Sequence, residues 1–165
     1  SIMHLLFNDE KILEFDSSFK CNPPLRSKKD QEALISGLKD GTIDAICTDH
    51  YAQDSESKIV EFDQAEYGIS TAQWTFAKAY EKLAQLIGLE TLTEAFTSSP
   101  RAILEIEKNE IEVGNSANFM VFSEDQTWNL DSKSNKSKSV NSPFFNTEIK
   151  GKVIACGVNK DITLY

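Results

Sequence analysis

The stretch Ile43-Asp44-Ala45-Ile46-Cys47-Thr48-Asp49-His50 decides the fold that we predict for this chain. Its apolar first half has the composition of a buried strand, and it ends in a carboxylate and an imidazole. A helix is predicted just before it, to about Lys39, because Ser27 followed by Asp30 is typical of a helix N-cap. A helix followed at once by a strand is an αβ unit, and such units build parallel sheets. We therefore predict an α/β fold with Asp49 at the C-terminal end of a parallel strand.

The composition bounds the class of protein. With 165 residues, 40% of them hydrophobic, the chain is large enough for a packed core. The formal charge of −9 argues against nucleic acid as a partner, which would require clustered Lys and Arg. No apolar run approaches the ~20 residues of a membrane helix, so we predict a cytoplasmic chain without a membrane span. Three well-separated cysteines without zinc-finger spacing are predicted to be free thiols: Cys21, Cys47 and Cys156.

The pattern changes along the chain. Up to about Glu107 we expect helices, a strand-like run from His4 to Phe7, and a long polar loop from Tyr51 to Ala65. Further helices are expected at Ile69–Ile87, from a capping box of Thr91 and Glu94 to Phe96, and from Ser99 onward. Short strands are expected at Ala117–Phe122, Thr147–Ile149, Lys152–Val158 and Asp161–Tyr165. We therefore predict two parts, residues 1–107 and 108–165, with a boundary near Asn109 to Asn115. The chain opens inside an element, so we expect it to be part of a longer one.

Two polar residues are candidates for chemistry, and each has a plainer alternative. Asp49 is either a metal ligand and proton carrier or a carboxylate that caps a loop. Asn22 precedes Pro23 and Pro24, and is either a turn residue or an amide held toward a pocket by the stiff prolines. The sequence contains no serine-protease set, phosphate-binding loop, dinucleotide fingerprint or zinc-protease motif.

Four motifs in order carry a resemblance to a known family. They are Lys20-Cys21-Asn22-Pro23-Pro24-Leu25-Arg26, Gly37-Leu38-Lys39-Asp40-Gly41-Thr42-Ile43-Asp44, Thr48-Asp49-His50 and Tyr67-Gly68. Together they resemble dihydroorotase, the amidohydrolase of pyrimidine synthesis. The segments Ser139–Phe144 and Gly151–Val153 resemble the closing β segment of the same family.

This resemblance implies an architecture. The chain would be the C-terminal part of a (β/α)₈, TIM-like barrel, followed by a small β-sandwich segment. Residues 1–107 would supply the last barrel strands and their helices, and residues 108–165 the C-terminal share of the small β domain. The first six barrel strands, and most of the metal ligands, are absent. We therefore expect the chain alone to bind zinc weakly and to be inactive.

The resemblance also implies a chemistry. The family interconverts dihydroorotate and carbamoyl aspartate on two zinc ions. Asp49 matches its metal-bound aspartate, which also acts as general acid and base. Asn22 matches a substrate-binding asparagine, and Tyr67 and Gly68 match a Phe-Gly pair whose backbone meets the substrate. Gln53 stands where the family has a substrate-binding histidine, so a neutral hydrogen bond would replace a charge-assisted one.

Departures from the family pattern keep two alternatives open. Besides Gln53, Tyr51 replaces an alanine, and Met3 replaces the first histidine of a Pro-His-His-Leu motif. A non-catalytic, dihydroorotase-like scaffold that partners aspartate carbamoyltransferase is therefore the alternative function, and a homo-oligomer is the other expected assembly. A sister cyclic amidase, such as hydantoinase or allantoinase, is the third possibility.

Overall fold

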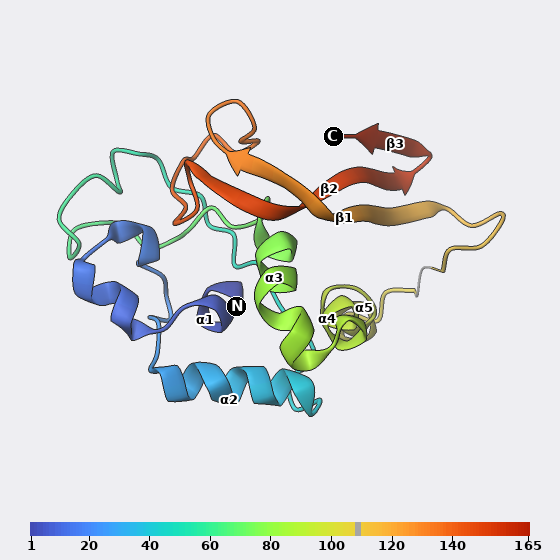
Figure 1. Ribbon diagram of the computed structural model, residues 1–165, viewed down its shortest axis with the longest axis horizontal. Helices are drawn as coiled ribbons and strands as arrows, with labels where there is room; N and C mark the ends of the chain where they lie inside the picture. Colours follow the sequence, from blue (N-terminus) through green and yellow to red (C-terminus); the bar gives the residue numbers. More distant parts are fainter. Residues whose placement is uncertain (108–109) are drawn as a thin grey trace.

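The computed structural model describes residues 1–107 and 110–165 of the chain. Five helices and a three-stranded antiparallel sheet are arranged around one core in these residues (Figure 1). The helices are α1 (Ile2–Leu6), α2 (Lys28–Lys39), α3 (Thr75–Ile87), α4 (Leu89–Phe96) and α5 (Ser98–Ile103). Two 3₁₀ turns, η1 (Asp9–Glu14) and η2 (Ser17–Phe19), precede α2. The strands are β1 (Ala117–Leu130), β2 (Thr147–Asn159) and β3 (Asp161–Leu164).

Helix α2 forms where its local sequence predicts. The Ser27 side chain accepts a hydrogen bond from the Asp30 amide, and the Asp30 carboxylate accepts from the Ser27 amide. This reciprocal capping box satisfies amides that the first helical turn leaves without partners. The helix ends at Lys39, with Asp40 as its C-cap, as expected from the Asp40-Gly41 pair.

Helix α3 joins the helical half to the sheet (Figure 1). It packs against α1, α2, α4 and β2, and its buried face includes Ala79 and Leu83, which are fully inaccessible to solvent. Trp74, just before the helix, is 1% exposed, and its ring packs edge-on against Phe144 from the segment before β2. A single buried cluster therefore includes residues from both predicted parts of the chain, among them Ile149 of β2. The predicted boundary at 107/108 borders residues 108–109, which lie outside the described residues.

The sheet has the order β1-β2-β3, with each neighbouring pair antiparallel. Two predicted strands, Thr147–Ile149 and Lys152–Val158, are one continuous strand, β2, and β1 extends past Phe122 to Leu130. Irregular register in β1, after Val121 and between Ser123 and Thr127, lets the long strand continue across its bends. Gly151 in β2 has a φ of 89°, and a Cβ there would meet the Phe122 ring. The sheet is open, so the described residues do not close a barrel.

Two predicted strands are corrected. The run from His4 to Phe7 is not a strand, because Ile2 to Leu6 form α1, whose four apolar side chains are buried. The segment Ile43–Thr48 is extended but makes no strand ladder. Its backbone bonds to helical neighbours instead: the Ile2 amide donates to Cys47 O, and the Ile46 amide donates to Ala95 O.

The other corrections concern helix starts. The helix predicted from Ile69 begins at Thr75, because Ile69 pairs with His50 in a parallel β-bridge. Helix α4 begins at Leu89 without a side-chain cap, so the capping box predicted at Thr91 does not form. The loop from Tyr51 to Ala65 contains turns only, as predicted.

Candidate functional site

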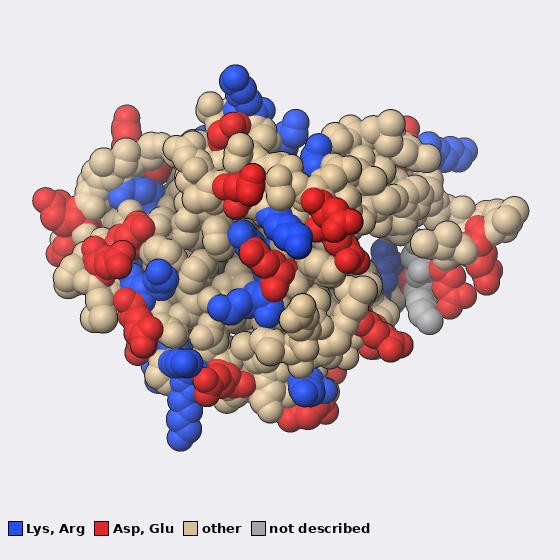
Figure 2. All heavy atoms as spheres, viewed as in Figure 1, with Lys and Arg blue, Asp and Glu red and all other residues tan. Residues whose placement is uncertain are grey.

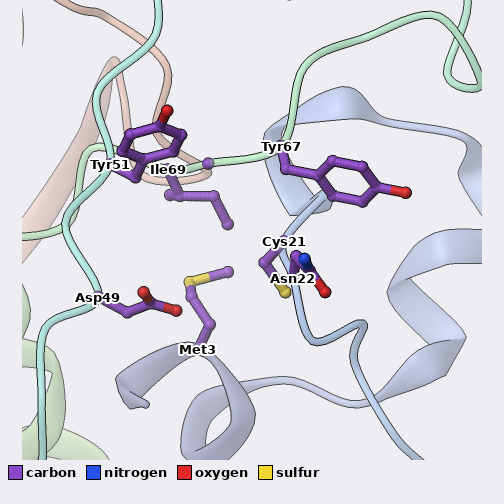
Figure 3. Close-up of a pocket in the computed structure, with 8 residues that line it drawn as sticks. Met3, Cys21, Asn22, Asp49, Tyr51, Tyr67 and Ile69 are labelled. Carbon is purple, nitrogen blue, oxygen red and sulfur yellow. The ribbon is translucent and has the colours of Figure 1, made fainter.

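One pocket brings together four of the five predicted site residues (Figure 3). It has a volume of about 210 Å³. Asp49 lies on one wall, Cys21 and Asn22 on the facing wall, and Met3 between them (Figure 3). The full lining consists of Met3, Cys21, Asn22, Asp49, Tyr51, Tyr67, Gly68 and Ile69. Residues far apart in the sequence therefore converge on a single cavity.

Asp49 is presented to this pocket by an unusual backbone. Its φ is 50°, in the left-handed region that aspartate tolerates better than most residues. The side chain is exposed, and no hydrogen bond or ion pair to it occurs within residues 1–107 and 110–165. A carboxylate that is accessible and uncommitted is available to a ligand or a proton. The alternative prediction, a capping carboxylate, has no hydrogen bond to support it.

His50 has a role that the sequence did not reveal. Its Nδ1 accepts hydrogen bonds from the Thr71 amide at 2.9 Å and the Ala72 amide at 3.1 Å. An accepting Nδ1 leaves the ring proton on Nε2. The Thr71 hydroxyl adds a bond to Thr48 O at 2.8 Å. These bonds fasten the segment that carries Asp49 to the chain just before α3, so His50 anchors the site from outside the pocket.

Cys21 and Asn22 form the opposite wall (Figure 3). Burial raises the pKa of the Cys21 thiol, and the nearby Asp49 carboxylate raises it further. The thiol donates to Pro23 O at 3.2 Å, so it stays protonated and committed to the backbone. Asn22 is exposed on the same turn. Its amide offers both a donor and an acceptor to a ligand.

Gly68 is fixed in place by its own backbone groups. Its amide donates to Lys20 O at 3.0 Å, and its carbonyl accepts from Asn141 Nδ2 at 2.6 Å and Lys58 Nζ at 3.2 Å. With φ at +124°, a Cβ here would lie 2.5 Å from Tyr51 O, so only glycine fits. The amide and the carbonyl of Gly68 are both already bonded. A ligand would therefore lie against the face of the backbone at Gly68 rather than bond to either group.

Gln53 lies outside the pocket lining. Its Nε2 donates to Tyr67 O at 2.8 Å, so the side chain braces the loop backbone. Its substrate-binding role stays a prediction. Sequence reasoning missed Lys20, Lys58 and Asn141, whose buried side chains hold the 51–68 loop. Lys20 and Asn141 belong to motifs of the family resemblance, but the burial of all three side chains depends on contacts between distant segments.

The described residues do not by themselves make a metal centre. They contain no group of three His, Cys, Asp or Glu side chains that could hold a metal ion. In the pocket, Asp49 is the one carboxylate, Met3 offers a soft thioether, and the Cys21 thiol is protonated. These residues fit one ligand position of a zinc site, and any other ligands would come from outside this chain.

Comparison with known proteins identifies the relatives. No family model matches the chain. A dihydroorotase of Caldanaerobacter subterraneus subsp. tengcongensis is 38% identical over 152 residues, which are 91% of this chain and 35% of that protein. A dihydroorotase of Aquifex aeolicus is 37% identical over 153 residues, 92% of this chain and 36% of that protein. The chain is a homologue of the C-terminal portion of dihydroorotases. It spans about a third of the length of these curated dihydroorotases.

Solved structures agree on the fold. An L-hydantoinase from Arthrobacter aurescens superposes with a TM-score of 0.81 and 19% identity, over 99% of this chain and 38% of that one. A D-hydantoinase from Thermus sp. gives a TM-score of 0.76 and 22% identity, over 90% of this chain and 34% of that one. The α/β arrangement around the pocket therefore has the fold of part of these hydantoinases.

Charge and hydropathy add two observations. Basic and acidic side chains are interspersed on the face seen in Figure 2. Among the described residues, no helix is long and apolar enough to cross a membrane.

Proposed function

We propose that this chain is part of a hydrolase that opens cyclic amide rings, with dihydroorotate and carbamoyl aspartate as its substrate and product in pyrimidine synthesis. One observation carries the proposal: Asp49, Asn22 and Gly68, from three separate segments, line one pocket. The homology to dihydroorotases supports the choice of substrate. A cytoplasmic location stays part of the proposal.

Each residue has a defined task in this reaction. A water oxygen bonds to the ring carbonyl carbon, the carbon–nitrogen bond breaks, and the nitrogen gains a proton. Asp49 takes the proton from the water and delivers it to the nitrogen, which suits an exposed carboxylate without other partners. The Asn22 amide would bond to the substrate carboxylate or ring amide, and the backbone at Gly68 would support the ring.

Zinc belongs to this proposal as the source of an activated water. A bound zinc ion lowers the pKa of water and so supplies a nucleophile near neutral pH. Asp49 would provide one ligand, and the others would come from the remainder of the complete protein.

A substrate panel tests the proposal in the complete protein. We expect turnover of dihydroorotate to exceed turnover of dihydrouracil, which has the same ring without the carboxylate. Preference for dihydrouracil or hydantoin would assign the protein to the sister cyclic amidases instead.

A non-catalytic scaffold is the second candidate, and two contacts favour it. Met3 lies beside Asp49 where the family has histidine, and Gln53 is bonded to the Tyr67 carbonyl (Figure 3). The proposed partner is aspartate carbamoyltransferase. No turnover of any ring in the panel, together with co-elution with that enzyme in size-exclusion chromatography, would establish the scaffold.

A further inference from the structure

Lys58 is a buried cation that the proposed chemistry does not use. It is 5% exposed, and it lies in the loop between the Asp49 segment and Gly68. Its ammonium donates to Glu66 O at 2.6 Å and to Gly68 O at 3.2 Å. No ion pair holds it in the part of the chain that the structure describes. The charge is therefore directed at two backbone carbonyls on either side of Tyr67.

This arrangement is costly for a lysine. Burial, together with the neighbouring Lys20 ammonium, lowers the pKa of Lys58 to about 8. Asp16, Cys21 and Glu66 oppose the shift and do not overcome it. A depressed lysine pKa means that the folded protein disfavours the charged form. The burial of this charge therefore offsets part of the stabilisation that its hydrogen bonds provide.

The ammonium of Lys58 bonds to the pocket wall at Gly68 and to Glu66 just before it. Lys20 holds the same loop further along, donating to Phe62 O at 2.7 Å and to Asp63 O at 2.9 Å. Asn141, from the segment before β2, shares the Gly68 carbonyl with Lys58. The Gly68–Ile69 peptide group is thus held at its carbonyl by Lys58 and Asn141, and the preceding peptide group is held through the Gly68 amide by Lys20 O. Gly68 lines the pocket next to Tyr51.

We propose that Lys58 is a positioning residue, which orients the Gly68 peptide so that its face can receive the ring of a cyclic amide. This inference rests on the proposed function, because it assumes that a ligand lies against Gly68. It assigns Lys58 no contact with the reacting atoms. Holding the Gly68 carbonyl in place gives a reason for a charged side chain to be buried here.

The test compares Lys58→Met with Lys29→Met in the complete protein. Methionine keeps the length of the side chain and removes the donor, whereas Lys29 is exposed on α2 and serves as the control. For Lys58→Met we expect a melting temperature close to that of the wild type, because the lost hydrogen bonds to Glu66 O and Gly68 O and the removed burial of charge oppose each other. We also expect KM for dihydroorotate to rise about tenfold, with kcat changed less than KM, because the ring then lies against a less firmly held Gly68 backbone. Lys29→Met should leave KM, kcat and the melting temperature unchanged.

Other results would overturn the inference. An unchanged KM in Lys58→Met would exclude positioning, and a lowered melting temperature with kcat and KM both impaired would indicate a structural role. Amide hydrogen exchange at residues 66–69 gives a readout that does not depend on turnover. Faster exchange there in Lys58→Met, but not in Lys29→Met, supports positioning even where the wild type fails to hydrolyse dihydroorotate. Unchanged exchange contradicts it, and wild-type inactivity by itself bears only on the proposed function.

Discussion

Replacing Gly68 by alanine tests whether the pocket wall is as tightly built as the structure indicates. A Cβ at this position would lie 2.5 Å from Tyr51 O and 2.6 Å from Tyr51 Cδ1, well inside van der Waals contact. Overpacking of this kind costs about 1–3 kcal/mol. The φ of +124° adds strain of about 1–3 kcal/mol for a residue with a side chain. We therefore expect Gly68→Ala to lower the free energy of unfolding by about 2–6 kcal/mol.

Gly41→Ala is the matched control for this change. Gly41 also has a positive φ, of +80°, but no atom lies within 4 Å of the site of a Cβ. Urea denaturation of the two variants separates the steric clash from the backbone strain, because only Gly68→Ala has both. We expect Gly68→Ala to be more destabilising than Gly41→Ala by about 1–3 kcal/mol. Equal losses in the two variants would refute the close approach of Tyr51 to Gly68.

Three further predictions concern charge, core and cap. Because the pKa of folded Lys58 is about 8 and that of an exposed lysine is higher, the unfolded chain binds more protons between pH 8 and 10. In urea titrations at pH 7.5, 8.5 and 9.5, the free energy of unfolding of the wild type, taken relative to that of Lys58→Met, should therefore rise by at most about 1.4 kcal/mol per pH unit. A fall with rising pH would contradict the lowered pKa of Lys58. Leu83→Ala should lower the free energy of unfolding by about 2–5 kcal/mol, because Leu83 is fully buried. The control Leu86→Ala should change it far less, because Leu86 is 49% exposed on the same helix. Similar losses in the two variants would contradict the packing of α3. Ser27→Ala should lower it by about 1 kcal/mol in the same assay through loss of the capping bond, and no loss would contradict the α2 cap.

The parts of the fold that depend on nearby residues could be predicted from the sequence. The Ser27–Asp30 capping box and the end of α3 at Gly88 follow from short motifs, and both are present. The convergence of Asp49, Asn22 and Gly68 could be expected from their motifs, although these lie far apart in the chain.

What depends on distant contacts could not be predicted. An apolar run such as Ile2–Leu6 is compatible with strand or helix, and in the fold it is a helix with four buried apolar side chains. The segment Ile43–Thr48 has strand composition, but its backbone bonds to α1 and to Ala95 of α4. Lys58 looks like a surface residue in a polar loop, and only the folded loop shows it directed at Gly68 O. The His50 bonds to the amides before α3 are likewise invisible in the sequence.

Hydrolysis of dihydroorotate by the complete protein carrying Asp49→Asn is the most direct test of the proposed site. The matched control is Asp44→Asn, an exposed carboxylate on the same segment that does not line the pocket. We predict that Asp49→Asn lowers kcat by at least about 10²-fold in both directions, the lower range for loss of a general acid–base group, and that Asp44→Asn leaves it unchanged. Wild-type turnover in Asp49→Asn would contradict the role of this carboxylate as the proton carrier.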